Sequence, residues 1–288
     1  MILIDGKKIA NDIRSEIKEK VEQIKFKTNS VPCLATILVG ENPASRVYIN
    51  SKIKACQECG VKSVHHNLKS NSSKEEIINL INQLNINPKI SAILLQLPFS
   101  DAQTEQECIN AISPNKDADG LHPFNAGLLT LFKSQKEISQ NNVLTSCTPT
   151  GIIRLLQKSD IEIAGKTAVV AGRSNLVGKP ASLLLLANDA TVIMAHSKTK
   201  NLKELCKSAD ILITAVGKPQ FINKDFIKDG AAVIDVGINR TENGLVGDID
   251  FDSVKDMNIK ITPVPGGVGP MTIAMLLENT LKAYRRNL

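Results

Sequence analysis

The stretch Gly165-Lys-Thr-Ala-Val-Val-Ala-Gly-Arg-Ser-Asn-Leu-Val-Gly-Lys-Pro-Ala-Ser-Leu-Leu-Leu-Leu186 decides the fold of this chain. Residues 167–171 are small or β-branched, which is typical of a strand buried on both faces. Gly172 breaks this run, and the residues around and after Pro180 favour a helix with proline in its first turn. The free N–H groups and the dipole of such a helix attract a phosphate. The stretch therefore predicts a strand, a tight turn and a helix that bind a nucleotide.

The turn departs from the general dinucleotide-binding pattern Gly-x-Gly-x-x-Gly. Ser174 stands where the second glycine belongs, and the later glycine is Gly178. Because glycine also occurs in the turns of other α/β crossovers, a purely structural turn remains an alternative at this point.

The end of the next predicted strand indicates which dinucleotide would bind. Residues 190–195 run into His196, Ser197 and Lys198, and no carboxylate follows the strand. Enzymes that bind NAD usually place Asp or Glu here to hold the ribose 2′-hydroxyl. Arg173 in the turn, together with these polar groups, can instead hold a 2′-phosphate through charge-assisted hydrogen bonds. We therefore expect NADP rather than NAD, with a solvated strand end as the alternative.

Length and composition indicate a soluble globular protein. A chain of 288 residues is long enough to form two domains. Its content of 42% hydrophobic and 22% charged residues is ordinary for a folded protein. Apolar runs are too short to span a membrane, and the N-terminus lacks a signal-peptide pattern. We expect a cytoplasmic protein without a membrane partner.

Charge and cysteine content argue against two further classes of protein. The net charge is +6, but the lysines are scattered, aromatic residues make up 3% and tryptophan is absent, so we expect no nucleic-acid partner. Of the six cysteines, Cys56 and Cys59 form a C-x-x-C inside a helical pattern with no second pair to match it. We expect reduced thiols and no metal site.

Strands and helices alternate through the first part of the chain. Apolar residues from Ile9 to Phe26 recur with the helical period, and Ser72 or Ser73 with Glu75 or Glu76 offers capping chemistry for a later helix. The predicted strands are 32–40, 61–68 and 90–98, and a further helix is predicted over 44–60. This alternation predicts a parallel α/β layer structure.

The pattern restarts after a connector rich in proline and aspartate at residues 113–123. A short helix is predicted over 148–158, and the strand at 167–171 is followed by buried strands at 211–217, 231–237 and 259–262 and a last helix at 271–286. The predicted fold class is two α/β domains, the C-terminal one a Rossmann-type doubly wound parallel sheet.

Several residues could carry chemistry. Tyr48 and Lys52 stand four apart on one predicted helix, so both face the same way, and a lysine near a hydride acceptor can donate or accept a proton. Gln96 ends an apolar strand and would face a cleft at the sheet edge, and Asp119 could hold two N–H groups of an amino-pyrimidine edge. The alternatives are a surface Tyr–Lys pair, a simple strand-end amide and Asx-turn chemistry, which fits Asp117 at least as well.

The most unusual stretch is Pro263-Val-Pro-Gly-Gly-Val-Gly-Pro-Met-Thr272, which leads into the last predicted helix. Three glycines permit close backbone approach while three prolines restrict flexibility. We favour ligand contact over a plain interdomain loop.

Taken together, these stretches resemble the bifunctional methylenetetrahydrofolate dehydrogenase/cyclohydrolase family of the FolD type. The stretches that carry the resemblance fall in the family's order: 44–54 (Ala-Ser-Arg-Val-Tyr-Ile-Asn-Ser-Lys-Ile-Lys), Leu95-Gln-Leu-Pro98, Lys116-Asp-Ala-Asp-Gly120, Cys147-Thr-Pro149, 170–180, 233–239 and 263–272. They span nearly the whole chain, and Ser174 in the turn is what this family has.

The resemblance implies a reaction. The enzyme would oxidise 5,10-methylenetetrahydrofolate with NADP and hydrolyse the resulting methenyl cation to 10-formyltetrahydrofolate, a step of one-carbon metabolism and purine biosynthesis. Lys52 would be the central catalytic residue, activating water, and Gln96 would hydrogen-bond Lys52 and tune its protonation. Tyr48 would orient the folate, and Asp119 would hold the pterin. A homodimer without metal is also implied.

The resemblance also implies binding residues and domain bounds. Besides the catalytic residues, the folate would contact Leu95, Leu97, Pro265, Gly269 and Pro270, and the dinucleotide would contact Gly172, Arg173, Ser174, His196, Ser197, Ile238 and Thr272. A folate-binding catalytic domain would take 1–145, completed by a returning helix at 270–288, and an NADP-binding domain would take 146–269.

One departure from the family concerns the wall beyond Gln96. The family commonly has Gln-Leu-Pro-Leu-Pro, whereas this chain continues with Phe99 and Ser100. The alternatives to the bifunctional reading are a monofunctional dehydrogenase and a non-catalytic NADP-binding regulator, which would not need Lys52 and Gln96 together.

Overall fold

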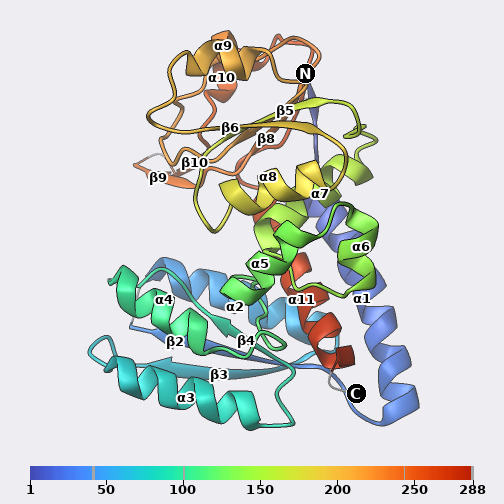
Figure 1. The fold of residues 1–288 in the computed structure, drawn as a ribbon, viewed down its shortest axis with the longest axis vertical. Helices are drawn as coiled ribbons and strands as arrows, with labels where there is room; N and C mark the ends of the chain where they lie inside the picture. Colours follow the sequence, from blue (N-terminus) through green and yellow to red (C-terminus); the bar gives the residue numbers. More distant parts are fainter. Residues whose placement is uncertain (41–42, 100, 243, 287–288) are drawn as a thin grey trace. The chain divides into compact units, whose positions relative to one another are not determined.

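The structure is a computed structural model that describes residues 1–40, 43–99, 101–242 and 244–286 (Figure 1). The chain divides into two compact units. The six-strand unit takes Met1–Ala10, Leu128–Asn141 and Ser146–Thr272, and the three-strand unit takes Asn11–Gly127, Asn142–Thr145 and Ile273–Leu288. No helix among the described residues is long and apolar enough to cross a membrane.

The three-strand unit is built on a parallel sheet in the order β3-β2-β4. Its strands are β2 (Cys33–Val39), β3 (Lys62–Leu68) and β4 (Ala92–Leu95). The helices that follow them are α2 (Pro43–Glu58), α3 (Lys74–Ile86) and α4 (Ala102–Ala111). The central strand β2 is buried over nearly its whole length, as an apolar run in the middle of a parallel sheet should be. The predicted parallel α/β structure is therefore confirmed.

One face of this sheet packs on α3 and α4. Ile37 and Ile93 of the sheet join Ile77 and Ile81 of α3 and Cys108 of α4 in one buried cluster. The predicted capping of α3 is present, because Ser73 and Glu76 accept each other's backbone N–H groups in a capping box.

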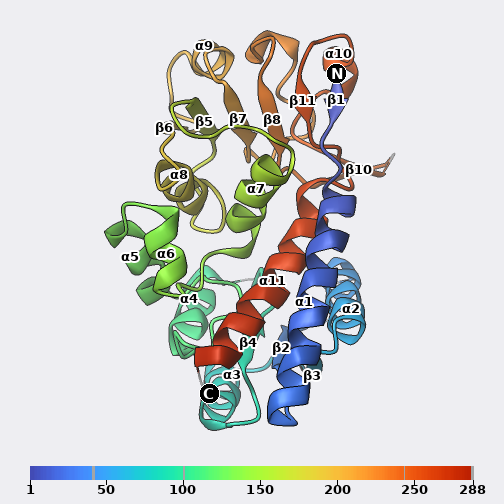
Figure 2. The ribbon, with the colours of Figure 1, turned by 90° about the vertical axis from the view of Figure 1, so that its right-hand side faces the viewer.

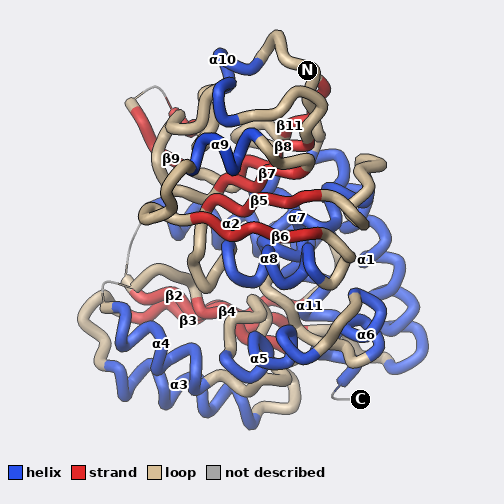
Figure 3. The backbone as a smooth tube through the Cα atoms, turned by 45° about the horizontal axis from the view of Figure 1, so that its top comes forward, coloured by secondary structure: helices blue, strands red, loops and turns tan. Residues whose placement is uncertain are grey.

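The six-strand unit carries a parallel sheet in the order β1-β11-β8-β7-β5-β6 (Figure 3). The strands are β1 (Ile2–Leu3), β5 (Thr167–Ala171), β6 (Thr191–Ala195), β7 (Ile211–Thr214), β8 (Ala232–Asp235) and β11 (Lys260–Ile261). Strand β5 has β6 on one side and β7 on the other, so the chain changes direction across the sheet at β5. Open α/β sheets bind ligands beyond the carboxyl ends of the strands at such a switch point.

The helices of this unit are short. They are α6 (Gln135–Gln140), α7 (Cys147–Lys158), α8 (Gly178–Leu186), α9 (Leu202–Lys207), α10 (Phe251–Val254) and the 3₁₀ turn Lys224–Phe226. The unit also has a hairpin of β9 (Asn239–Thr241) and β10 (Gly244–Val246). Val169, Leu212, Val233 and Ile261 of four neighbouring strands form the core of one face. The predicted two-domain α/β fold class with a Rossmann-type sheet is confirmed.

Two long helices have residues in both units, α1 (Gly6–Thr28) and α11 (Val268–Arg286), and Figure 2 shows them running alongside each other. In the three-strand unit the buried Asn279 amide of α11 donates to the carbonyl oxygens of Ala118 at 3.0 Å and Thr145 at 2.9 Å. The Tyr284 and Thr28 hydroxyls lie 3.3 Å apart. The last helix therefore returns to the N-terminal part of the chain, as predicted.

The structure adds elements that the sequence patterns did not predict. These include β1, α4, α10, the β9–β10 hairpin, α5 (Pro123–Leu131) and α6. Helix α11 also begins at Val268, so Gly269 and Pro270 lie in its first turn, where proline costs no hydrogen bond. All six cysteines are buried free thiols.

Candidate active site

Lys52 and Gln96 come together in the three-strand unit although they are 44 residues apart in the chain. Lys52 Nζ donates to Gln96 Oε1 at 2.9 Å. Gln96 follows β4 directly, and its backbone N–H donates to the Ile37 carbonyl, continuing the β4–β2 ladder. The Gln96 Nε2 group donates to the Leu97 carbonyl at 2.8 Å, which fixes the amide with its oxygen toward the lysine. The sheet edge therefore presents a partly buried ammonium group whose acceptor is itself held by a second hydrogen bond.

Tyr48 lies one helical turn before Lys52 on α2, and 38% of it is exposed. The spacing of four places both side chains on one face of the helix, as predicted. A phenol at this place offers a flat apolar ring beside the lysine.

Asp119 lies on a segment that is anchored on two sides. Asp117 forms a parallel bridge with Ile93 of β4, so Asp119 comes close to the carboxyl end of that strand. Ala118 donates its N–H to the Ile93 carbonyl, and its own carbonyl accepts the Asn279 amide. Asp119 itself is partly buried. The carboxyl edge of β4 thus carries Gln96 and, on the neighbouring segment, Asp119.

Asp117 is the structural member of this pair of carboxylates. It is 2% exposed and accepts the N–H groups of Leu121 and His122 and the Asn125 amide. Burial raises the pKa of the Asp117 carboxyl, against these hydrogen bonds, which lower it. The turn chemistry that the sequence allowed for Asp117 is therefore present, and Asp119 remains available to a ligand.

The other residues predicted to line this site follow the same strand. Leu95 is the last residue of β4 and is buried, while Leu97 is partly buried and precedes a cis peptide bond to Pro98. Ser100, part of the departure from the family pattern, lies outside the described residues.

The turn after β5 explains the two glycines of the stretch that is predicted to bind phosphate. Gly172 has φ +149°, and a Cβ there would lie 2.5 Å from the Ala215 carbonyl oxygen. A Cβ on Gly178 would overlap the Gly172 carbonyl group and lie 2.7 Å from the Arg173 nitrogen. Only glycine at these positions lets the first turn of α8 pack directly on the loop.

Ser174, which breaks the general glycine pattern, has a role of its own in the turn. Its hydroxyl oxygen accepts the N–H of Val177 at 3.1 Å and that of Gly178 at 3.4 Å. It thereby satisfies the backbone donors of Val177 and Gly178, where the turn runs into α8.

The groups predicted to hold a 2′-phosphate lie at the ends of neighbouring strands. The Gly172 N–H donates to the Ala195 carbonyl at the end of β6, so Arg173 and His196 follow paired strands at one sheet edge. Arg173 and Ser197 are exposed. The His196 N–H donates to the Thr199 hydroxyl at 2.8 Å, which closes the turn after β6.

The remaining predicted residues of this unit lie after β8 and at the start of α11. Ile238 is 48% exposed and follows β8. Pro265 is exposed and preceded by a cis peptide bond, and Gly269 and Pro270 are partly buried. The Thr272 hydroxyl lies 2.9 Å from that of Thr148 on α7, which ties the start of α11 to that helix.

Sequence reasoning missed two fully enclosed carboxylates of the six-strand unit, Asp235 and Asp248, which are 3% and 0% exposed. The available signal was an aspartate inside the apolar strand 231–237, because a buried carboxylate needs several donors.

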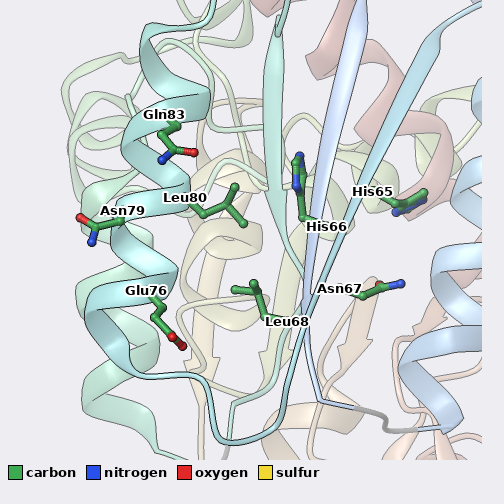
Figure 4. Close-up of a pocket in the computed structure, with 8 residues that line it drawn as sticks. All are labelled: His65, His66, Asn67, Leu68, Glu76, Asn79, Leu80 and Gln83. Atoms are coloured by element: carbon green, nitrogen blue, oxygen red, sulfur yellow. The ribbon is translucent and has the colours of Figure 1, made fainter.

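A pocket of about 540 Å³ lies elsewhere, between β3 and α3 of the three-strand unit (Figure 4). In Figure 4, Leu80 and Gln83 of α3 face His66 and Leu68 of the edge strand. None of the predicted site residues lines this pocket, so it is separate from the candidate site.

The fold, the Lys52–Gln96 site and the turn after β5 together define a class of protein. It is the two-unit α/β enzymes that pair a dinucleotide-binding sheet with a second parallel sheet. Two family models match the chain. The catalytic domain of tetrahydrofolate dehydrogenase/cyclohydrolase matches residues 4–119, and the NAD(P)-binding domain of tetrahydrofolate dehydrogenase/cyclohydrolase matches residues 146–288. The chain therefore belongs to the tetrahydrofolate dehydrogenase/cyclohydrolase family, and the predicted resemblance and nicotinamide cofactor class are confirmed.

Individual relatives match over nearly the whole chain. The bifunctional protein FolD of Acetivibrio thermocellus is 51% identical over 284 residues, 98% of this chain and 96% of that protein. The crystal structure of the bifunctional FolD enzyme from Campylobacter jejuni has a TM-score of 0.92 at 44% identity and covers all of both chains. The Trypanosoma brucei FolD structure, complexed with NADP cofactor and inhibitor, has a TM-score of 0.91 at 36% identity, covering 99% of this chain and 98% of that one.

Proposed function

We propose that this chain is a bifunctional folate enzyme. It oxidises 5,10-methylenetetrahydrofolate to 5,10-methenyltetrahydrofolate with NADP, and then hydrolyses the methenyl compound to 10-formyltetrahydrofolate. The observation that carries the proposal is the hydrogen bond of 2.9 Å between Lys52 and Gln96, since a chain that only binds a dinucleotide has no need of this pair. Family membership supports both activities.

The lysine serves the hydrolytic step. Because Gln96 Oε1 holds one N–H of Lys52, the nitrogen of the lysine has a fixed position from which it can exchange a proton with a water molecule. The Gln96 amide is itself held by the Leu97 carbonyl, so it orients the lysine and tunes its protonation. Lys52 is therefore proposed as the residue that activates water.

Two further residues bind the folate. Tyr48 shares a helix face with Lys52 and packs against the substrate beside it. Asp119 uses its two carboxylate oxygens to accept N–H groups of the pterin's amino-pyrimidine edge. Leu95, Leu97, Pro265, Gly269 and Pro270 complete the proposed folate contacts.

The turn after β5 fits a dinucleotide phosphate. The cradle exists because Gly172 and Gly178 lack side chains that would fill it, and the Ser174 hydroxyl holds the turn that leads into α8. NADP, when bound, accepts the hydride from the substrate. The proposed cofactor contacts of this chain are Gly172, Arg173, Ser174, His196, Ser197, Ile238 and Thr272. The proposed domains are a folate-binding domain of 1–145 with 270–288 and an NADP-binding domain of 146–269.

Arg173→Ala is expected to lower kcat/KM for NADP by about 10- to 100-fold, because a hydrogen bond to a charged group contributes roughly 1.5–3 kcal/mol. The value for NAD, which lacks the 2′-phosphate, is expected to stay within about 3-fold. Initial rates with each cofactor measure both. Lys203→Ala is the matched control, because Lys203 is a cation of the same unit whose partner is Asp225. An equal loss with both cofactors would contradict the assignment of Arg173 to the 2′-phosphate.

The reaction itself is tested with purified protein, 5,10-methylenetetrahydrofolate and NADP. The absorbances of NADPH and of the methenyl compound are followed together. Reduced cofactor without methenyl accumulation supports both activities. Accumulation of the methenyl compound would instead favour a monofunctional dehydrogenase, and binding of NADP without any turnover would favour a non-catalytic regulator.

We further propose that the enzyme works in the cytoplasm as a homodimer and supplies one-carbon units to purine biosynthesis. These assignments rest on the family resemblance. Sedimentation equilibrium of the full chain tests the dimer, and a monomer at micromolar concentration would contradict it.

A further inference from the structure

Two carboxylates with no assigned role lie beneath the carboxyl edge of the six-strand sheet. Asp248 is 0% exposed and Asp235 is 3% exposed. Buried carboxylates are costly unless several donors surround them, so the chain must provide those donors from nearby segments. Which segments these are determines what the two residues do.

The Asp248 carboxylate accepts backbone N–H groups of the segment that follows β7. Its Oδ2 atom accepts the N–H of Val216 at 2.7 Å and that of Gly217 at 3.1 Å. Its Oδ1 atom accepts the N–H of Lys218 and the Asn239 side-chain amide, at 3.1 and 3.0 Å. Successive N–H groups that converge in this way form an anion-binding concavity, and here the anion is a side chain of the protein itself.

Asp235 in turn fixes Asp248. Its Oδ1 atom accepts the Asp248 N–H and the Gly237 N–H, both at 3.0 Å, and the Thr214 hydroxyl at 3.1 Å. Its Oδ2 atom accepts the Ile249 N–H at 3.0 Å. The ends of β7 and β8 and the segment at 248–249 are thereby joined through one carboxylate.

Glycines make room for both carboxylates. A Cβ on Gly237 would lie 2.5 Å from the Asp248 nitrogen, and a Cβ on Gly247 would overlap Asp235 Oδ2. Neither carboxylate could reach its donors if these positions carried side chains.

The segments held by Asp248 are parts of the dinucleotide site. Ala215, which precedes Val216, is the residue whose carbonyl oxygen would be 2.5 Å from a Cβ on Gly172. Ala215 also donates its N–H to the Ala171 carbonyl at the end of β5. The segment at 215–218 therefore forms one wall of the phosphate turn, and Asn239 directly follows Ile238, the exposed residue proposed to contact the cofactor.

We propose that Asp248 is a positioning residue for the nicotinamide dinucleotide. It never touches the cofactor. Its carboxylate holds the backbone at 216–218 and the Asn239 side chain in the conformation that the cofactor needs. These groups follow β7 and β8, which lie on one side of the switch point. Because the Asp248 carboxylate already accepts the N–H groups at 216–218, these groups are not available to a phosphate. The cofactor phosphate therefore binds at the turn after β5. This inference rests on the proposed NADP-dependent function.

Asp248→Asn in the full-length protein tests the inference. The amide keeps the shape of the side chain but turns one acceptor into a donor, so at least one N–H group loses its partner. We expect KM and Kd for NADP to rise by about 10-fold or more, while kcat at saturating NADP changes by less than about 3-fold. Hydrolysis of methenyltetrahydrofolate without cofactor is expected to stay within about 2-fold and reports on folding.

Asp210→Asn is the matched control. Asp210 belongs to the same unit and accepts the Thr167 N–H at 3.0 Å together with Lys228 Nζ, but it lies at the amino end of the same sheet. The same change of charge there is expected to leave KM for NADP unaltered. An equal rise of KM for NADP in both variants would overturn the proposal, because the loss of one negative charge alone would then explain the effect.

A second variant and a second measurement distinguish a specific loss of cofactor binding from misfolding. Asn239→Ala removes one donor and is expected to raise KM for NADP several-fold. Hydrogen exchange should show faster exchange of residues 214–219 in Asp248→Asn, with β6 unchanged. The proposal is overturned if NADP binding is normal in Asp248→Asn, or if that variant unfolds while Asn239→Ala binds NADP normally. Wild-type protein that fails to bind NADP would overturn the proposed function as well.

Discussion

Lys52→Met is expected to lower the rate of methenyltetrahydrofolate hydrolysis by about 10²- to 10⁴-fold, the usual contribution of a positioned general acid or base. Methionine has nearly the length of the lysine stem but cannot exchange a proton with water. It also leaves Gln96 Oε1 without the donor that holds it at 2.9 Å. The decay of methenyl absorbance in the absence of cofactor measures this step alone.

The helix that carries Lys52 provides a matched control. Lys54 lies two residues further on, its side chain is 78% exposed, and its partner is Glu58 one turn later. Lys54→Met removes the same charge from the same helix and should leave hydrolysis within about 2-fold, since exposed ion pairs contribute little. Near-normal hydrolysis by Lys52→Met would contradict the proposed role of the lysine and favour the monofunctional alternative.

The sequence predicted the elements whose residue types match their burial. Strand β5 and strand β7 are continuous apolar runs inside a parallel sheet, so their positions could be read from composition and length. Helix α4 could have been found from Asp101, whose carboxylate accepts the N–H groups of Gln103 and Thr104 as an N-cap does. Four-residue α10 and the three-residue strands β9 and β10 are too short for any periodic signal.

The candidate site could be predicted only in part. Strand-end reasoning placed Gln96 at a sheet edge, and helix periodicity paired Tyr48 with Lys52. The hydrogen bond between Lys52 and Gln96 was implied by the family resemblance alone, because it depends on α2 packing against a sheet, which no local pattern encodes. The role of Asp248 was invisible for the same reason, because its donors come from segments about 30 and 9 residues away and are mostly backbone N–H groups. Ser174 differs from Asp248 in this respect, because a hydrogen bond to a residue only three positions away explains its departure from the general glycine motif.

Gly178→Ala is expected to weaken NADP binding by more than about 100-fold, because the new methyl group meets backbone rather than a side chain that could move aside. A Cβ there would lie 2.5 Å from the Gly172 carbonyl carbon and 2.7 Å from the Arg173 nitrogen. The first turn of α8 must therefore move away from the loop after β5, which removes the contact that presents its N–H groups to phosphate. Calorimetric titration with NADP measures the affinity.

The same substitution separates the two activities. Lys52 and Gln96 belong to the three-strand unit, so cofactor-independent hydrolysis by Gly178→Ala should continue while NADP reduction fails at ordinary cofactor concentrations. Gly127→Ala in α5 is the control, since a Cβ there meets nothing within 4 Å, and it should stabilise the protein by up to about 1 kcal/mol without affecting either activity. Unchanged NADP affinity in Gly178→Ala would mean that the cofactor phosphate does not bind at the turn after β5, and the site would have to be sought elsewhere along the carboxyl edge of the sheet.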